Sequence, residues 1–320
     1  MSINLNLKQT SEVLNVDAPR TYSIDLTNYT DLGDVGFTLG DLGITDHEDF
    51  AVIKAHDGYY YGFLSDFSGA AHNKIMYVKS STYTFDSLIA FGTAYNVADR
   101  RPSGKIEYDP IAEKYYLICG GVYSIETTKA NFPIGWGNEV TLLTVGGGGA
   151  WDDDAVALST PFNFGNNLSA VLFDGRANAA PPYLHKIGLA YAPNNRTAFV
   201  KSASSPVYTI STAWAATFSS LRGMLQFGDV GIIAFEGRSN GKWSVGFLTV
   251  KMGDVPIIIE HPSNPIFDDS LAWVPAGNSV ANPYFLNDRD QYRSGEFIMY
   301  HDYRTNGVWD KIRVLKYTSS

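Results

Sequence analysis

Residues 57–64 read Asp-Gly-Tyr-Tyr-Tyr-Gly-Phe-Leu, a turn dipeptide followed by an aromatic run that is typical of a buried β-strand. A second apolar run follows after a polar interval, so the two runs predict a β-hairpin. The pair recurs four more times along the chain. The first runs lie at residues 59–64, 115–119, 168–173, 230–235 and 296–301, and the second at 74–78, 122–126, 186–192, 243–250 and 311–317. Five consecutive sheet repeats are therefore predicted.

The repeat length indicates the architecture. The first runs start at residues 59, 115, 168, 230 and 296, which gives spacings of 56, 53, 62 and 66 residues by subtraction. Four-stranded propeller blades occupy about 40–50 residues, so these are blades with longer loops. We expect an all-β, five-bladed β-propeller that forms one domain over residues 1–320. The expected blades cover residues 46–99, 100–150, 151–215, 216–267 and 268–320.

The last blade is one strand short, because the chain ends soon after residue 317. The N-terminal stretch 1–45 is expected to supply the closing strand, from the alternating segment 3–16 or 20–28. Such closure removes an open sheet edge. The alternative is two independent β-sandwiches of about 160 residues each, half the chain. No linker-like change of composition appears in mid-chain, which favours the propeller.

Composition narrows the functional classes. The net charge of −9 argues against nucleic acid as a partner, since phosphate binding needs a basic face. Cys119 is the single cysteine and lies in an apolar run, so a buried, inert thiol is expected. We find no signal-peptide pattern and no apolar run of about 18 residues. The expectation is a cytoplasmic or virion protein without a membrane partner.

Three stretches resemble the five-bladed propeller glycoside hydrolases, namely arabinanases, β-xylosidases and the related mannoside phosphorylases. They are residues 48–60, Glu-Asp-Phe-Ala-Val-Ile-Lys-Ala-His-Asp-Gly-Tyr-Tyr, residues 172–177, Leu-Phe-Asp-Gly-Arg-Ala, and residues 186–190, Lys-Ile-Gly-Leu-Ala. In outline the resemblance covers almost the whole chain. It implies three carboxylates that converge on the central funnel: a general base, a general acid, and a third that orients the acid.

The resemblance assigns two of the three catalytic positions. It places Asp49 as the base and Asp154 as the carboxylate that adjusts the acid, both facing the axis within about 10 Å of each other. Blade four should supply the acid, but residues 219–224 read Ser-Ser-Leu-Arg-Gly-Met. Arg222 cannot protonate a leaving group, although it can bind a hydroxyl, a sugar carboxylate or phosphate. Glu236 is the candidate for a displaced acid, and it would have to reach inward from the next strand.

Four residues are candidates for substrate binding, and three of them have a structural alternative. Arg101 either lines the funnel or brackets a turn, and Trp151 is either a sugar platform or blade core. Arg222 and His301 are the other two candidates, although the sequence favours a strand-end histidine held by hydrogen bonds for His301. The run at residues 152–154 suits a solvated loop or calcium, without EF-hand spacing. We expect no other metal and no cofactor.

Three functions are compatible with these residues. The first is a carbohydrate-recognising propeller that binds a glycan or polysaccharide without complete catalytic machinery. The second is a structural or receptor-binding virion protein that contacts other virion subunits. The third is an active inverting glycosidase that uses Asp49, Asp154 and Glu236.

Overall fold

The computed structural model describes most of the chain. The described residues are 3–6, 21–69, 74–103, 106–164, 168–177, 185–194, 196–210, 212–253, 255–288, 292, 294–305 and 307–319. In these residues strands dominate, and the 3₁₀ helices η1 (Leu39–Leu42) and η2 (Ala213–Ala215) lie outside the sheets. Within these residues no helix has the length and apolar character needed to cross a membrane.

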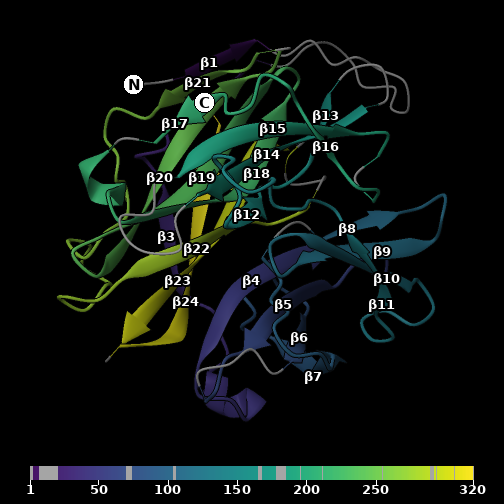
Figure 1. Ribbon diagram of the computed structural model, residues 1–320. Helices are drawn as coiled ribbons and strands as arrows, with labels where there is room; N and C mark the ends of the chain where they lie inside the picture. Colours follow the sequence, from purple (N-terminus) through teal and green to yellow (C-terminus); the bar gives the residue numbers. More distant parts are fainter. Residues whose placement is uncertain are drawn as a thin grey trace.

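Five antiparallel sheets follow one another around a central axis in chain order (Figure 1), which confirms the predicted five-bladed β-propeller. Blade 1 contains, from the innermost strand outward, β4 (His47–Lys54), β5 (Tyr60–Asp66), β6 (Lys74–Ser80) and β7 (Leu88–Tyr95). Blade 2 contains β8 (Ile106–Asp109), β9 (Lys114–Cys119), β10 (Tyr123–Thr128) and β11 (Gly137–Thr141). Blade 3 contains β12 (Ala155–Leu158), β14 (Leu168–Arg176), β15 (Lys186–Ala192) and β16 (Val200–Lys201), with β13 (Phe162–Phe164) paired to β14 and β17 (Tyr208–Thr209) paired to β15.

Blade 4 contains β18 (Phe218–Phe227), β19 (Val230–Ser239), β20 (Lys242–Lys251) and β21 (Ile257–Glu260). Blade 5 contains β22 (Val280–Phe285), β23 (Glu296–Thr305), β24 (Val308–Thr318) and, from the N-terminal part of the chain, β3 (Thr30–Asp34). The predicted pairs of apolar runs are the second and third strands of each blade. They were visible in the sequence because the second strands are buried along almost their whole length. The third strands also bury most of their apolar side chains, although some of their positions are partly exposed.

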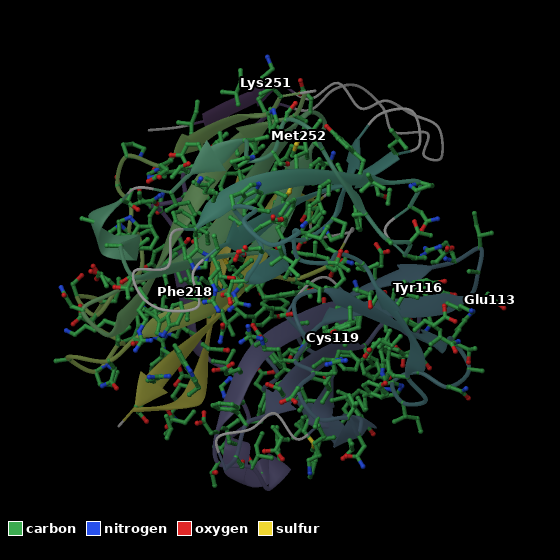
Figure 2. The ribbon with its side chains drawn as sticks, in the orientation of Figure 1. Glu113, Tyr116, Cys119, Phe218, Lys251 and Met252 are labelled. Carbon is green, nitrogen blue, oxygen red and sulfur yellow. The ribbon has the colours of Figure 1, made fainter. Side chains whose placement is uncertain are left out.

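The hydrophobic core lies between neighbouring blades rather than at the axis. Five clusters of buried side chains fill the five interfaces, and each cluster combines residues of two adjacent sheets. Cys119 belongs to the cluster between blades 1 and 2 (Figure 2). Burial raises the pKa of its thiol to about 12, as expected for an inert cysteine.

Aromatic rings lie directly over glycines of the adjacent strand in two blades. A methyl group at Gly62 would collide with the ring of Phe50, and one at Gly188 would collide with the ring of Phe173. We expect Gly62→Ala and Gly188→Ala each to lower the free energy of unfolding by about 1–3 kcal/mol, because the buried ring has no space to move into. Chemical denaturation measures this loss.

Gly137 provides the matched control, since no atom lies within 4 Å of a methyl group placed there. Gly137→Ala should change stability by less than about 0.5 kcal/mol. Equal losses at Gly137 and Gly62 would show that packing between ring and glycine is not the cause.

The closing strand lies further along the chain than expected. The segment that pairs with β24 in blade 5 is β3, whereas residues 3–6 and 21–24 form the separate two-stranded sheet β1–β2. Residues 7–16 of the expected segment lie outside the described part of the chain. As an edge strand, β3 is half-exposed and polar, so it has no apolar alternation to identify it. Its position is fixed instead by ion pairs from Arg313 to Asp31 and Asp34.

Candidate functional site

Three innermost strands carry a polar residue at a break in their pairing. In β4 the register shifts between Glu48 and Phe50, which leaves Asp49 as an extra residue with φ of 60°. The shift in β18 falls at Arg222 and Gly223, and the shift in β22 falls at Asn282, which has φ of 50°. Such bulges bend a strand and redirect a side chain. Asp and Asn are the residues that best tolerate this left-handed backbone.

The side chain of Arg222 joins two of the predicted catalytic carboxylates. One terminal nitrogen donates to Asp49 Oδ1 (3.3 Å), and the other donates to Glu236 Oε1 in a very short hydrogen bond. All three side chains are at least 90% buried. Burial works against the charged guanidinium, but the charges of Glu236 and Asp49 raise the pKa of Arg222 further above its ordinary value. Arg222 is therefore a permanent cation between two carboxylates.

Glu236 reaches inward from β19, as the displaced-acid hypothesis required. Its second oxygen, Oε2, accepts a hydrogen bond from the backbone N–H of Asn282 in blade 5 (2.9 Å). Burial raises the pKa of Glu236, while Arg222 and that N–H group oppose the shift. Only 1% of the residue is exposed, so Glu236 has no direct access to solvent.

Arg101 approaches the same cluster from the segment before blade 2. It donates to Glu48 Oε2 (2.9 Å), and its Nε lies 3.5 Å from Asp49 Oδ2. About a third of the Arg101 side chain is exposed. The structure thus places Arg101, Asp49, Arg222 and Glu236 together, with Arg101 on the solvent side.

Asn282 extends the polar network into blade 5 and back to blade 1. Its Nδ2 donates to Asp302 Oδ2 (2.8 Å), and Asp302 Oδ1 lies 3.2 Å from His47 Nε2. The Nδ1–H of His47 donates to the carbonyl of Trp309 (2.7 Å). Burial lowers the pKa of His47, but Asp302 outweighs it and the net shift is upward. Burial also raises the pKa of Asp302, so this fully buried pair holds one proton firmly.

Asp154 belongs to a different ion pair. It lies just before β12 and accepts a hydrogen bond from Arg176 Nε of the same blade (2.7 Å). Its side chain is about a quarter exposed. Among the described residues, its ion pair is thus with Arg176 and not with Arg222, so the expected convergence with the base is not seen in the contacts.

The three carboxylates at residues 152–154 diverge. Asp152 pairs with Lys201 (2.5 Å), Asp153 accepts from the N–H of Gly149 (2.6 Å), and Asp154 pairs with Arg176. In the described part of the chain, no group of three or more acidic, histidine or cysteine side chains could hold a metal ion. The calcium interpretation of this run has no geometric support.

Trp151 and His301 are placed away from the axial cluster. Trp151 stacks on Phe173 (centroids 5.5 Å apart) and closes over Gly175, so it packs as blade core. His301 is fully buried against Phe267 (4.4 Å) in the interface between blades 4 and 5. Burial lowers the pKa of His301 to about 3, which keeps the ring neutral. Strand alternation sends His301 to the opposite face of β23 from Asp302.

Sequence reasoning missed Glu48, Asn282, Asp302 and His47. His47 and Glu48 directly precede the predicted base, which was the available signal for them. Asn282 precedes a proline in an otherwise apolar strand, and such an interruption indicates a bulge. Nothing in the sequence points to Asp302, because its partners come from β4 and β22.

In this arrangement both candidate catalytic carboxylates, Asp49 and Glu236, are paired with Arg222. Inverting hydrolysis needs one protonated and one ionised carboxyl group about 6.5–9.5 Å apart, with a water between base and sugar. Here the Arg222 guanidinium occupies the space between Asp49 and Glu236. The groups nearer solvent, Arg101 and Glu48, offer several donors and acceptors for sugar hydroxyls.

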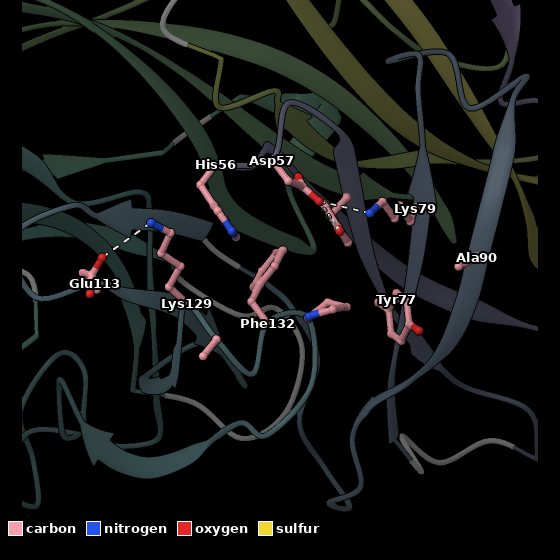
Figure 3. A pocket seen from close by; sticks show the side chains of 11 residues that line it. His56, Asp57, Tyr77, Lys79, Ala90, Glu113, Lys129 and Phe132 are labelled. Atoms are coloured by element: carbon pink, nitrogen blue, oxygen red, sulfur yellow. Dashed lines mark hydrogen bonds and ion pairs between the residues drawn. The ribbon is translucent and has the colours of Figure 1, made fainter.

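A cavity of about 680 Å³ lies elsewhere, between blades 1 and 2 (Figure 3). His56 and Asp57, in the turn after β4, lie on its rim. His56 lies seven positions after Asp49, so the cavity is roughly 23 Å from the axial cluster at about 3.3 Å per strand residue. The charges in the cavity are paired with one another, Lys79 with Asp57 (3.0 Å) and Lys129 with Glu113 (3.4 Å). It is therefore distinct from the axial site.

Comparisons with known proteins agree with the geometry at the level of the fold. The structure is similar to the catalytic domain of a Coprinopsis cinerea GH62 α-L-arabinofuranosidase, with 14% identity, coverage of 91% of this chain and 98% of that chain, and a TM-score of 0.61. It is similar to a Podospora anserina α-L-arabinofuranosidase solved with cellotriose, with 10% identity, coverage of 91% and 96%, and a TM-score of 0.60. A thermostable family-43 glycoside hydrolase gives 12% identity, coverage of 87% and 90%, and a TM-score of 0.55.

No protein-family model and no curated protein matches the sequence. The structural similarity confirms the fold that the resemblance implied, a glycoside-hydrolase-like five-bladed propeller.

Proposed function

We propose that this protein binds a saccharide at the mouth of its central funnel and does not hydrolyse it. The observation that carries the proposal is the buried bridge of Arg222 to both Asp49 and Glu236. Arginine cannot donate a proton at neutral pH, and its guanidinium excludes water and substrate from the space between the carboxylates.

The glycosidase alternative requires a different arrangement of the same residues. Arg222 would have to leave, and Glu236 would have to lose two hydrogen-bond donors and reach solvent. Removing a buried cation from two carboxylates is costly, which disfavours such a rearrangement.

Saccharide binding is supported by the solvent-side groups of the cluster and by the fold. The side chain of Arg101 is partly exposed and lies beside the carboxylates of Glu48 and Asp49, as expected for a residue that binds hydroxyl groups. One similar structure was solved with cellotriose and another GH62 hydrolase with xylotriose. None of these structures is described as a virion component, so they do not support the virion alternative.

Binding and turnover should be measured together on one panel of oligosaccharides and aryl glycosides. We expect wild-type protein to bind at least one saccharide, and Arg101→Ala to weaken that binding about tenfold or more, because it removes a charged hydrogen-bond donor. Arg100→Ala is the matched control, since the neighbouring Arg100 pairs with Glu139 in the outermost strand of blade 2.

The turnover measurement distinguishes recognition from catalysis. We expect no product from any panel member, with wild-type protein or with Asp49→Asn. Product formation by wild-type protein that Asp49→Asn abolishes would establish hydrolysis and overturn the proposal.

A further inference from the structure

Blades 4 and 5 share a hairpin motif, in which Arg, Asn-Gly and Trp occupy the same four of six positions. Residues 238–243 read Arg-Ser-Asn-Gly-Lys-Trp, and residues 304–309 read Arg-Thr-Asn-Gly-Val-Trp. In blade 4, Asn240 and Gly241 both have positive φ, 52° and 80°, as the tight two-residue hairpin turn requires. In both hairpins the arginine and the tryptophan are paired across the two strands.

Each arginine of this motif lies over the indole of its own hairpin. The guanidinium of Arg238 is 5.6 Å from the ring centre of Trp243, and that of Arg304 is 4.3 Å from the ring centre of Trp309. Such stacking orients a guanidinium while leaving its N–H groups free to bind.

Ser279, the residue before β22, connects the two hairpins. Its Oγ accepts a hydrogen bond from the N–H of Trp243, and its carbonyl accepts one from the N–H of Arg304, both at 3.1 Å. Side chains alternate along a strand, so Arg238 lies on the same face of blade 4 as Ala234, and Trp243 lies on the same face as Val245. Ala234 and Val245 belong to the core shared with blade 5, so this face of blade 4 is turned toward blade 5. The two Arg–Trp hairpins therefore lie side by side.

These two arginines differ from the others in their partners. Arg100, Arg101, Arg176, Arg196, Arg222 and Arg313 each form an ion pair with a carboxylate. Among the described residues, neither Arg238 nor Arg304 has a carboxylate within 4.0 Å. Arg304 Nε is buried and has no hydrogen-bond partner there either.

The electrostatic surroundings of Arg304 favour the approach of an anion. Burial lowers the pKa of Arg304, and the positive charge of Arg238 lowers it further. The negative charges of Asp46 and Glu48 raise it, but the net shift is downward. Those two carboxylates are engaged elsewhere: Glu48 binds Arg101, and Asp46 accepts from the N–H of Trp309 (3.0 Å). Two neighbouring cations that no described carboxylate contacts directly attract an anionic group.

An aromatic surface adjoins the paired arginines. Phe218 contacts Trp243 edge to face at 5.1 Å, and both side chains are partly exposed. Sugar rings stack on such surfaces. Glu48 forms an ion pair with Arg101, and its negative charge also raises the pKa of Arg304. This surface is therefore coupled electrostatically to the axial cluster.

We propose that the two Arg–Trp hairpins bind the anionic group of an acidic saccharide, a carboxylate or a sulfate, at the edge of the funnel mouth. The inference rests on the proposed function and adds the class of ligand. The bound anion would receive hydrogen bonds from Arg238 and Arg304 while the sugar ring contacts Trp243 and Phe218.

The test uses pairs of probes that differ only in charge. The probes are oligogalacturonates with their carboxyl-reduced counterparts, and a sulfated galactan oligosaccharide with its desulfated form. Titration calorimetry with wild-type protein should give tighter binding of at least one acidic member than of its neutral counterpart, about tenfold to a hundredfold. The preference should shrink as salt is added.

Arg238→Ala and Arg304→Gln should remove most of this preference and leave the affinity for the neutral member nearly unchanged. Arg100→Ala is the control, because Arg100 is likewise stacked on an aromatic ring, Tyr123, but is already paired with Glu139. Thermal unfolding establishes that each variant is folded, and Arg238 is exposed enough for its replacement to be tolerated.

The outcomes separate this inference from the proposed function. Equal affinity for charged and neutral members, unaltered by either substitution, overturns the anion site while saccharide binding stands. Failure of every saccharide to bind overturns both. A charge preference that survives in both variants places the anion elsewhere and also rejects the inference.

Discussion

Replacement of Arg222 by alanine is expected to lower the free energy of unfolding by about 3–5 kcal/mol, the usual cost of removing one partner from a buried ion pair. The loss arises because Asp49 and Glu236 remain buried without their shared cation. Urea denaturation at pH 7 measures it. The variant should regain stability as the pH falls, since both carboxyl groups can then bind protons and lose their charge.

Two further variants identify the cause of that loss. Arg222→Lys should recover only part of the stability, because one ammonium group cannot bind both carboxylates as the planar guanidinium does. Arg100→Ala removes a partly exposed ion pair and should cost about 1 kcal/mol or less. A similar small cost for Arg222→Ala, without pH dependence, would contradict the buried bridge.

Removal of the His47–Asp302 pair should be almost as damaging. Among the described residues, His47→Ala leaves the buried Asp302 carboxylate with Asn282 as its one remaining partner, and about 3–5 kcal/mol of stability should be lost. Asp302→Asn should cost much less, because an amide can donate to the neutral imidazole while His47 still donates to Trp309.

The same pair predicts how stability depends on pH. The pKa of His47 and that of Asp302 are both raised in the folded protein, so the folded pair keeps a proton that the unfolded chain has released above pH 6.5. Their contribution to stability is therefore complete below pH 6.5 and is lost as the pH rises through the raised value. Denaturation curves between pH 6 and 9 should show this decline in wild-type protein and not in Asp302→Asn. An identical decline in the variant would assign the effect to other groups.

The blade framework was predictable because its strands satisfy strong local rules. The second strand of each blade is buried along almost its whole length, so it appears as an aromatic or aliphatic run such as the one before Leu64. The closing strand β3 could not be found in the same way. Its pairing with β24 depends on polar contacts to Arg313, more than 270 residues away.

The axial site was predictable only in part. Asp49, Arg101, Arg222 and Glu236 were identified from strand starts and from the resemblance, and the structure brings all four together. Their contacts depend on bulges at Asp49, Arg222 and Asn282, and of these only the bulge at Asn282, which precedes a proline, has a signal in the sequence. Asp154 was matched by its position at a strand start, but Arg176 across the β12–β14 pairing neutralises it. His301 lies in a run apolar on both faces, so alternation could not tell which way it points.

The most direct test of the central claim is the recovery of a bound saccharide. An oligosaccharide that binds in titration should be incubated with the protein for a day and then released by denaturing the protein. Mass spectrometry measures the mass of the released saccharide. We expect the intact oligosaccharide, in equal amount from wild-type protein and from Asp49→Asn. Shortened products that form with wild-type protein and not with Asp49→Asn would show that the funnel is a working active site, and would contradict recognition without hydrolysis.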